Sequence, residues 1–118
     1  MKVAVTLISY NQEKYIYDAL LGISNQTLQP DEVIIADDCS TDRTRHIIEN
    51  YVKNNDLVGK WKLIFNEHNI GITKNLRKAL EYVTADIVVG MAGDDISLPN
   101  RCAHAVECFN NYPNLYII

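Results

Sequence analysis

Hydrophobic residues along this chain fall into two alternating patterns. Four short runs are mostly apolar and rich in β-branched residues, as in strands buried on both faces; they cover residues 3–8, 33–36, 61–65 and 87–92. Other apolar residues recur at helical spacing. These helical faces are Ile16, Ala19, Leu20 and Ile23; Ile47, Ile48, Tyr51 and Val52; Leu76, Ala79, Leu80 and Val83; and Cys102, Ala105, Val106 and Phe109. The alternation predicts an α/β fold, a doubly wound, mostly parallel sheet with helices on both faces.

Residues beside these runs predict where helices begin and where the chain continues. Asn11 is the capping candidate of the first helix, and Ser40 or Thr41 is that of the second. Ser97 and Pro99 are expected to open the fourth helix. Residues 115–118 predict a fifth strand with nothing after it. We therefore expect one domain, truncated after its fifth strand, that is a fragment of a longer protein.

Polar clusters follow each of the four strand-like runs. They occupy residues 9–11, 37–40, 66–71 and 93–95. In doubly wound sheets, ligands bind beyond the carboxyl ends of the strands. The sequence therefore predicts a binding site at this edge of the sheet.

Composition narrows the class of protein. With 118 residues, 47% of them hydrophobic and 22% charged, the chain is long and apolar enough to bury a core. Its net charge of −4 is opposite to that expected of a nucleic-acid binder, so no nucleic-acid partner is predicted. No apolar run approaches the ~20 residues of a transmembrane helix. The 3 cysteines lack metal-ligand spacing and are expected to be free thiols.

Asp94 and Asp95 are the first candidates for chemistry. They follow the strand-like run 87–92 and precede a helix. Paired carboxylates suit magnesium or manganese, which prefer oxygen ligands. The alternative is an Asp-rich turn that caps the helix.

A second acidic cluster consists of Asp37, Asp38 and Asp42. Capping and first-turn positions account for one or two of these acids. One carboxylate could instead accept a hydrogen bond from the ring N–H of a nucleobase.

Tyr10 and Lys74 complete the candidates. Tyr10 ends the first strand, where its ring either stacks on a ligand or packs on the first helix. Lys74 lies in the first turn of a helix entered through Gly71, a position that suits an anion site, and the alternative is a solvated lysine.

Five sequence stretches occur together in a fixed order. They are 5–11 (VTLISYN), 26–27 (QT), 34–42 (IIADDCSTD), 69–75 (NIGITKN) and 93–101 (GDDISLPNR). In this order and spacing the chain, from residue 3 to residue 118, resembles the family 2 glycosyltransferases. That family has the GT-A fold, in which a Rossmann-like nucleotide-binding half precedes an acceptor-binding half. The resemblance implies that residues 1–118 form a single nucleotide-sugar-binding domain.

The resemblance also implies a role for each candidate. Tyr10 would lie against the nucleobase, and Asp38 would accept the N–H of uracil or a similar base. Lys74 would approach the nucleotide, and Asp94 would contact the ribose. Asp95 would hold a divalent cation, manganese or magnesium, on the diphosphate.

Two departures from the family pattern accompany these roles. Ala92 stands where the longer form of the family's acid motif has its first Asp. The family's common Ala-Arg-Asn continuation is replaced by residues 74–77, Lys-Asn-Leu-Arg. Asp37 is expected to support its turn rather than to touch the nucleotide.

The activity implied is metal-assisted transfer of a sugar, with inversion, from a nucleoside-diphosphate sugar to an acceptor hydroxyl. A UDP-sugar is the expected donor, and a glycan or lipid-linked acceptor would bind through the missing half. No catalytic residue is assigned, because the general base is expected beyond Ile118, and the isolated chain is expected to be inactive. The expected location is cytoplasmic, at the inner membrane face if the missing portion carries an anchor.

Two other classes of protein compete with the transferase. A non-catalytic nucleotide-binding or interaction module with the same fold would suit the loss of the first motif Asp. A phospho-receiver domain has a similar length, but it needs paired acids after the first strand, where this chain has Ser9, Tyr10 and Asn11.

Overall fold

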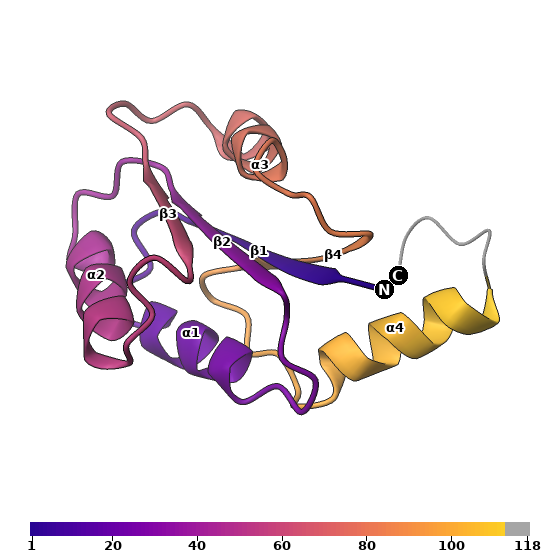
Figure 1. Ribbon diagram of the computed structural model, residues 1–118. Coiled ribbons are helices and arrows are strands. Elements are labelled where there is room, and N and C mark those ends of the chain that lie inside the picture. The colour runs from indigo at the N-terminus through magenta and orange to yellow at the C-terminus, as the bar shows by residue number, and fades with distance from the viewer. Residues whose placement is uncertain (113–118) are drawn as a thin grey trace.

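Strands and helices alternate throughout the computed structural model, which describes residues 1–112 (Figure 1). In chain order they are β1 (Val3–Ser9), α1 (Ile16–Ser24), β2 (Glu32–Asp37), α2 (Thr44–Asn54), β3 (Lys62–Phe65), α3 (Ile72–Leu80), β4 (Ile87–Ala92) and α4 (Arg101–Asn111). The predicted alternation is therefore confirmed. The predicted fifth strand, residues 115–118, lies outside the described residues. No helix within residues 1–112 has the length and apolar character needed to cross a bilayer.

The four strands form one parallel sheet in the order β3-β2-β1-β4. The register places Ile8 of β1 opposite Ala36 of β2 and Ala92 of β4, so these three strands end at the same edge. The chain moves outward from β1 to β3 and then crosses back to β4 on the other side of β1. This reversal creates a topological switch point between β1 and β4, where doubly wound sheets bind ligands. The fold class predicted from the sequence is confirmed.

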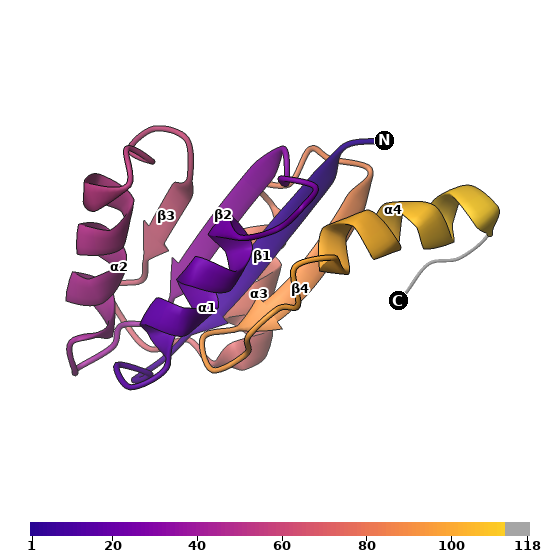
Figure 2. The same ribbon diagram turned by 90° about the horizontal axis from the view of Figure 1, so that it is seen from below.

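Two hydrophobic cores cover the two faces of the sheet. Helices α1, α2 and α4 lie on one face and α3 lies on the other (Figures 1 and 2). Because side chains alternate along a strand, Val33 and Ile35 enter the larger core beneath α1 and α2, whereas Ile34 and Ala36 enter the smaller core beneath α3. The predicted apolar faces of the first two helices are confirmed by burial of Ile16, Ala19, Leu20, Ile23, Ile48, Tyr51 and Val52.

The predicted face of the third helix is wrong in part. Leu76 and Leu80 are 37% and 42% exposed, whereas the residues of α3 that point to the sheet are Asn75 and Ala79. Each helical residue turns by about 100°, so the position after an inward residue turns away from the sheet. The side of α3 that faces the sheet thus includes a polar residue, Asn75, which a pattern of hydrophobic residues does not reveal.

The predicted helix caps are also wrong. Helix α1 begins at Ile16 and α2 at Thr44, and no side chain caps either helix. Helix α4 begins at Arg101, after Ser97 and Pro99, and it too has no side-chain cap. Asn11 and Ser40 instead take part in a set of hydrogen bonds between two loops at the carboxyl edge.

Candidate functional site

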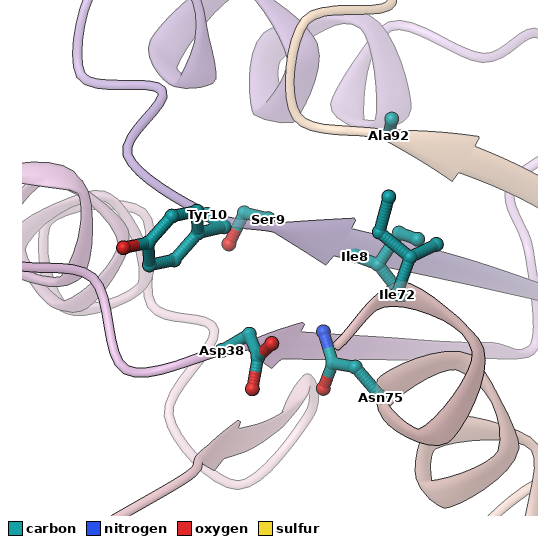
Figure 3. A pocket seen from close by; sticks show the side chains of 7 residues that line it. All are labelled: Ile8, Ser9, Tyr10, Asp38, Ile72, Asn75 and Ala92. Carbon is teal, nitrogen blue, oxygen red and sulfur yellow. The ribbon is translucent and has the colours of Figure 1, made fainter. Parts of the chain in front are cut away.

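A small pocket opens where β1, β2 and β4 end beside the first turn of α3. Its volume is about 80 Å³, and it is lined by Ile8, Ser9, Tyr10, Asp38, Ile72, Asn75 and Ala92 (Figure 3). The structure therefore brings together two predicted site residues, Tyr10 and Asp38. Lys74, Asp94 and Asp95 are not among the lining residues.

Tyr10 and Asp38 lie on the same side of this pocket, with Ile72 across from them (Figure 3). The Tyr10 side chain is 45% exposed, so its ring is not buried against the first helix. A half-exposed aromatic ring beside a buried carboxylate offers a stacking surface and a hydrogen-bond acceptor to one planar ligand.

Asn11 joins the loop after β1 to the loop after β2. Its backbone is left-handed, with φ of 49°, and its N–H donates to Oγ of Ser40 at 2.9 Å. Its side-chain Oδ1 accepts the N–H groups of Thr41 at 2.8 Å and Asp42 at 3.3 Å. These bonds use the polar groups that the sequence assigned to helix capping, and they hold Tyr10 at the pocket.

Asp37 supports the turn after β2, as predicted. Its side chain is 1% exposed, and its Oδ1 accepts the hydroxyls of Ser9 at 2.7 Å and Ser40 at 2.6 Å. Its Oδ2 accepts the N–H of Ser40 at 3.0 Å. Both oxygens of Asp37 are bonded to β1 and to its own turn, and Asp37 is not among the residues that line the pocket.

Asp38 holds the segment that leads into α3. Its Oδ1 accepts the N–H of Ile70 and its Oδ2 that of Gly71, both at 2.9 Å, and Nδ2 of Asn66 donates to Oδ1 at 3.0 Å. Gly71 has φ of 90°, a left-handed conformation that glycine adopts without strain. Asp38 therefore has a structural function that the sequence did not reveal.

The environment of Asp38 keeps its carboxylate ionised. Burial acts to raise the pKa of Asp38, but the hydrogen bonds from Ile70, Asn66 and Gly71 and the positive charge of Lys78 outweigh it. The pKa of Asp38 consequently lies below its ordinary value. A carboxylate that is charged at neutral pH and lines a pocket is a strong acceptor for a ligand N–H.

A polar network extends from Asp38 into the interior beneath α3. Asn66 and Asn75 are 6% and 2% exposed, and Nδ2 of Asn66 donates to Oδ1 of Asn75 at 2.9 Å. Nδ2 of Asn75 donates to the carbonyl of Ala36 at 2.9 Å, and Nζ of Lys78 donates to Oδ1 of Asn66 at 3.0 Å. Sequence reasoning placed Asn66 in the polar cluster of residues 66–71 but gave it no role, and it missed Lys78. The available signal was the spacing of Asn75 and Lys78, which places them on adjacent turns of one helix.

Lys74 lies in the first turn of α3, as predicted, and its side chain is exposed. Within residues 1–112 it makes no hydrogen bond or ion pair. The cation that the structure places in the Asp38 network is Lys78, one turn further along the same helix.

Asp94 and Asp95 form an exposed turn at the end of β4. Gly93 donates its N–H to the carbonyl of Ile8 at 2.9 Å, which ties this turn to β1. Oδ2 of Asp95 accepts the N–H of Ala92 at 2.9 Å, and no described residue donates to Oδ1. Within residues 1–112 no three His, Cys, Asp or Glu side chains gather in a way that could hold a metal ion.

Gln12 packs closely under the acidic turn. A Cβ atom on Gly93 would clash with the end of the Gln12 side chain and would lie 3.0 Å from Cδ1 of Ile16. Oε1 of Gln12 is buried and accepts no hydrogen bond from the described residues. Glycine at position 93 thus allows the start of the first helical segment to approach the end of β4.

The cysteines take no part in the pocket. Cys39, Cys102 and Cys108 are all free thiols, as predicted. Burial raises the pKa of the Cys102 thiol, so it is an inert core residue.

Comparison with known proteins identifies the family. The profile of Glycosyl transferase family 2 matches residues 4–118, and the chain belongs to this family. The putative glycosyltransferase EpsE of Bacillus subtilis is 29% identical over 117 residues, which are 99% of this chain and 41% of that protein. The chain also covers 32% of an uncharacterized protein of Mycobacterium bovis to which it is 35% identical, so it spans about a third to two fifths of the length of these two relatives.

Solved structures share the fold. TarS from S. aureus in complex with UDP-GlcNAc matches with a TM-score of 0.82 and 32% identity over 96% of this chain and 32% of that chain. The mannosyltransferase PcManGT from Pyrobaculum calidifontis, in complex with GDP-Man and Mn²⁺, matches with a TM-score of 0.75 and 27% identity over 88% of this chain and 30% of that chain. The four-stranded parallel sheet with its covering helices thus has the arrangement of a GT-A fold.

Proposed function

We propose that this chain binds a nucleoside-diphosphate sugar, with a UDP-sugar as the preferred donor, and is the donor-binding domain of a longer glycosyltransferase. The observation that carries the proposal is the pocket in which Tyr10 and Asp38 meet at the carboxyl edge of the sheet. The match to TarS, which was solved with UDP-GlcNAc and is more similar to this chain than PcManGT with GDP-Man, supports a uridine nucleotide. Only a hydrogen-bond donor on the ligand fits the charged Asp38 carboxylate.

In this proposal each predicted residue acts on one part of the donor. The ring of Tyr10 stacks on the base, and Asp38 accepts its ring N–H. Asp94, exposed at the end of β4, contacts the ribose, and Lys74 neutralises charge on the nucleotide. Stacking fixes the plane of the base and the carboxylate fixes its edge, so the two together orient the diphosphate toward the end of β4.

The acidic turn fits a divalent cation that takes some of its ligands from the protein and the others from the diphosphate. Asp95 has one carboxylate oxygen engaged by Ala92, and its other oxygen points to no donor among the described residues. Magnesium and manganese commonly take only one or two protein carboxylates and complete their shell with phosphate and water. When bound, the cation would stabilise the negative charge that develops on the departing diphosphate.

The remaining steps belong to parts of a longer protein. Inversion by a single displacement needs a general base for the acceptor hydroxyl, and we place this base and the acceptor site outside residues 1–118. We accordingly propose that the 118-residue chain alone binds donor but transfers no sugar. A glycan or lipid-linked acceptor and a cytoplasmic location are part of the same proposal.

A second candidate is a nucleotide-binding module without catalysis. The observation that favours it is Ala92, which lines the pocket with a methyl group where the family's longer acid motif carries a carboxylate. A turnover assay on the longer protein with several sugar nucleotides separates the two candidates. Sugar transfer supports the enzyme, and saturable binding without transfer supports the module.

Mapping of UDP binding by NMR tests the proposed site. We expect UDP to shift the backbone amide resonances of Tyr10, Asp38 and Gly71. Lys60 and Trp61, which line a groove at the opposite end of the strands, serve as internal controls and should not shift. Shifts centred on Lys60 and Trp61, or none in the folded protein, would contradict the proposal.

A further inference from the structure

Asp38 has little remaining capacity for a ligand. Its Oδ1 already accepts the N–H of Ile70 and Nδ2 of Asn66, and its Oδ2 accepts the N–H of Gly71. A carboxylate accepts about four hydrogen bonds, two on each oxygen. The remaining acceptor position is therefore on Oδ2, and its direction depends on how the three protein donors hold the carboxylate.

Two of these donors are fixed by the backbone, but the Asn66 amide depends on its own partners. Nδ2 of Asn66 donates to both Asp38 and Asn75, so the nitrogen must face these two oxygens. A rotation of the amide by 180° would turn its oxygen toward two acceptors and leave no hydrogen bond with either. The position of the Asp38 carboxylate thus depends on the orientation of the Asn66 amide.

Lys78 stabilises that orientation from the other side of the amide. Its Nζ donates to Oδ1 of Asn66 at 3.0 Å, and its side chain is half-buried on α3. An ammonium group can only donate hydrogen bonds, so the side of the Asn66 amide that faces Lys78 must be its oxygen and not its nitrogen. Its positive charge also stabilises the nearby Asp38 carboxylate.

We propose that Lys78, acting through Asn66, is a positioning residue that sets the base selectivity of Asp38. This inference rests on the proposed donor-binding function. A correctly held Oδ2 accepts the N3–H of uracil, whereas cytosine presents a ring acceptor at N3 and is repelled by the same carboxylate. A site built around one such hydrogen bond strongly rejects the base that lacks the donor.

The inference is tested by measuring UDP and CDP affinities, with Mn²⁺ present, by calorimetry on the parent chain and three variants. Lys78→Met removes the ammonium and keeps the alkyl stem, and Lys78→Arg keeps the charge and the donors. Arg77→Met, an exposed position on the same helix, is the matched control for loss of charge. We expect Lys78→Met to reduce the preference for UDP over CDP roughly three- to tenfold, with Lys78→Arg restoring part of it and Arg77→Met leaving it unchanged.

A second measurement decides the positioning role without any nucleotide. Amide hydrogen exchange at Ile70 and Gly71, whose N–H groups bond to Asp38, should accelerate in Lys78→Met but not in Arg77→Met, while exchange at the core residue Leu7 stays the same. Parental exchange at Ile70 and Gly71 in Lys78→Met would overturn the inference, as would a parental UDP-to-CDP ratio. If the parent chain binds neither nucleotide, the proposed function fails, and the exchange rates still decide whether Lys78 positions Asp38.

Discussion

Asp37 and Asp38 adjoin in the sequence, and their carboxylates bond to different parts of the fold. Asp37 accepts hydrogen bonds from Ser9 and Ser40, which ties the end of β1 to the turn after β2. Asp38 accepts the N–H of Gly71 and of the residue before it, which fixes the entrance of α3. One acidic pair thus organises both sides of the carboxyl edge.

The first prediction concerns stability and Asp37. Asp37→Asn replaces an acceptor oxygen by a donor amide in a fully buried site, so the side chain can no longer accept all three hydrogen bonds that Asp37 accepts. We expect the free energy of unfolding, measured by urea denaturation, to fall by about 2 kcal/mol. The control is Asp56→Asn, because Asp56 is exposed at φ of 56°, a conformation that Asn tolerates well. Equal losses in the two variants would show that Asp37 does not support the turn.

The second prediction concerns the stability of the fold at low pH. The pKa values of Asp38 and Asp42 lie below the ordinary value because hydrogen bonds to their carboxylates outweigh burial. A lowered folded-state pKa gives stability that is present above the unfolded-state pKa and is lost as the pH falls through the folded-state value. The free energy of unfolding should therefore decrease as the pH is lowered below about 4.

Asp38→Asn provides the check on this acid effect. It removes one of the titrating groups, so the variant should be less stable at neutral pH and should lose less further stability between about pH 4 and about pH 2. Urea midpoints measured across this range give the comparison. If the urea midpoint of the variant fell with pH as steeply as that of the parent, Asp38 would not contribute to the acid effect.

The third prediction concerns Gly93. Gly93→Ala adds a methyl group that clashes with the end of the Gln12 side chain and lies 3.0 Å from Cδ1 of Ile16; because the end of Gln12 can shift, we expect a loss of about 1 kcal/mol, the low end for overpacking. The double variant Gly93→Ala with Gln12→Ala should recover much of the loss, measured by thermal or urea unfolding. Gly90→Ala is the matched control, since its Cβ would meet only Oγ1 of Thr6 at 3.8 Å. If the losses in the free energy of unfolding of the two single variants simply added, Gln12 would not be in close contact with position 93.

The sequence predicts the fold well because its signals are periodic. The strand-like runs and the faces of α1 and α2 are long enough for hydrophobic spacing to fix them, and the structure confirms them. The prediction for α3 is wrong because the side of this helix that faces the sheet includes the polar residue Asn75. Hydrogen bonds with Ala36 and Asn66 satisfy its buried amide. Periodicity of apolar residues cannot reveal a polar side chain that is satisfied by a distant partner.

The site is predictable at the level of residue types but not of their partners. Tyr10 and the acidic pair Asp37 and Asp38 are candidates because they lie at the ends of neighbouring strands, and the choice of Asp38 over Asp37 comes from the family resemblance. Asn11 is misassigned as a cap because its partners, residues 40–42, are remote in sequence and approach only when β1 and β2 pair. Lys78 is missed for the same reason, since a lone lysine on a helix has no meaning until Asn66 is placed beside it.

The fourth prediction concerns the acidic turn. Asp95→Asn keeps the shape of the side chain but removes the charge that attracts a hard cation, so the Mn²⁺-dependent part of UDP binding should disappear while the fold survives. Asp94→Asn should weaken UDP binding with or without Mn²⁺, because its proposed partner is the ribose. Calorimetry in the presence and absence of Mn²⁺ separates the two. Parental metal dependence in Asp95→Asn would exclude Asp95 as a ligand.

The central claim, that the pocket at the carboxyl edge binds a uridine nucleotide, is tested most directly by calorimetric titration of UDP into the parent chain, Tyr10→Ala and Tyr15→Ala. Both tyrosines are exposed, at 45% and 57%, so neither substitution should disturb the fold, and only Tyr10 lines the pocket. Stacking of a base on an aromatic ring contributes about 1–3 kcal/mol. The account predicts saturable UDP binding that Tyr10→Ala weakens by about tenfold and Tyr15→Ala leaves unchanged. Equal affinity in Tyr10→Ala and the parent, or no UDP binding by the folded parent, would contradict it.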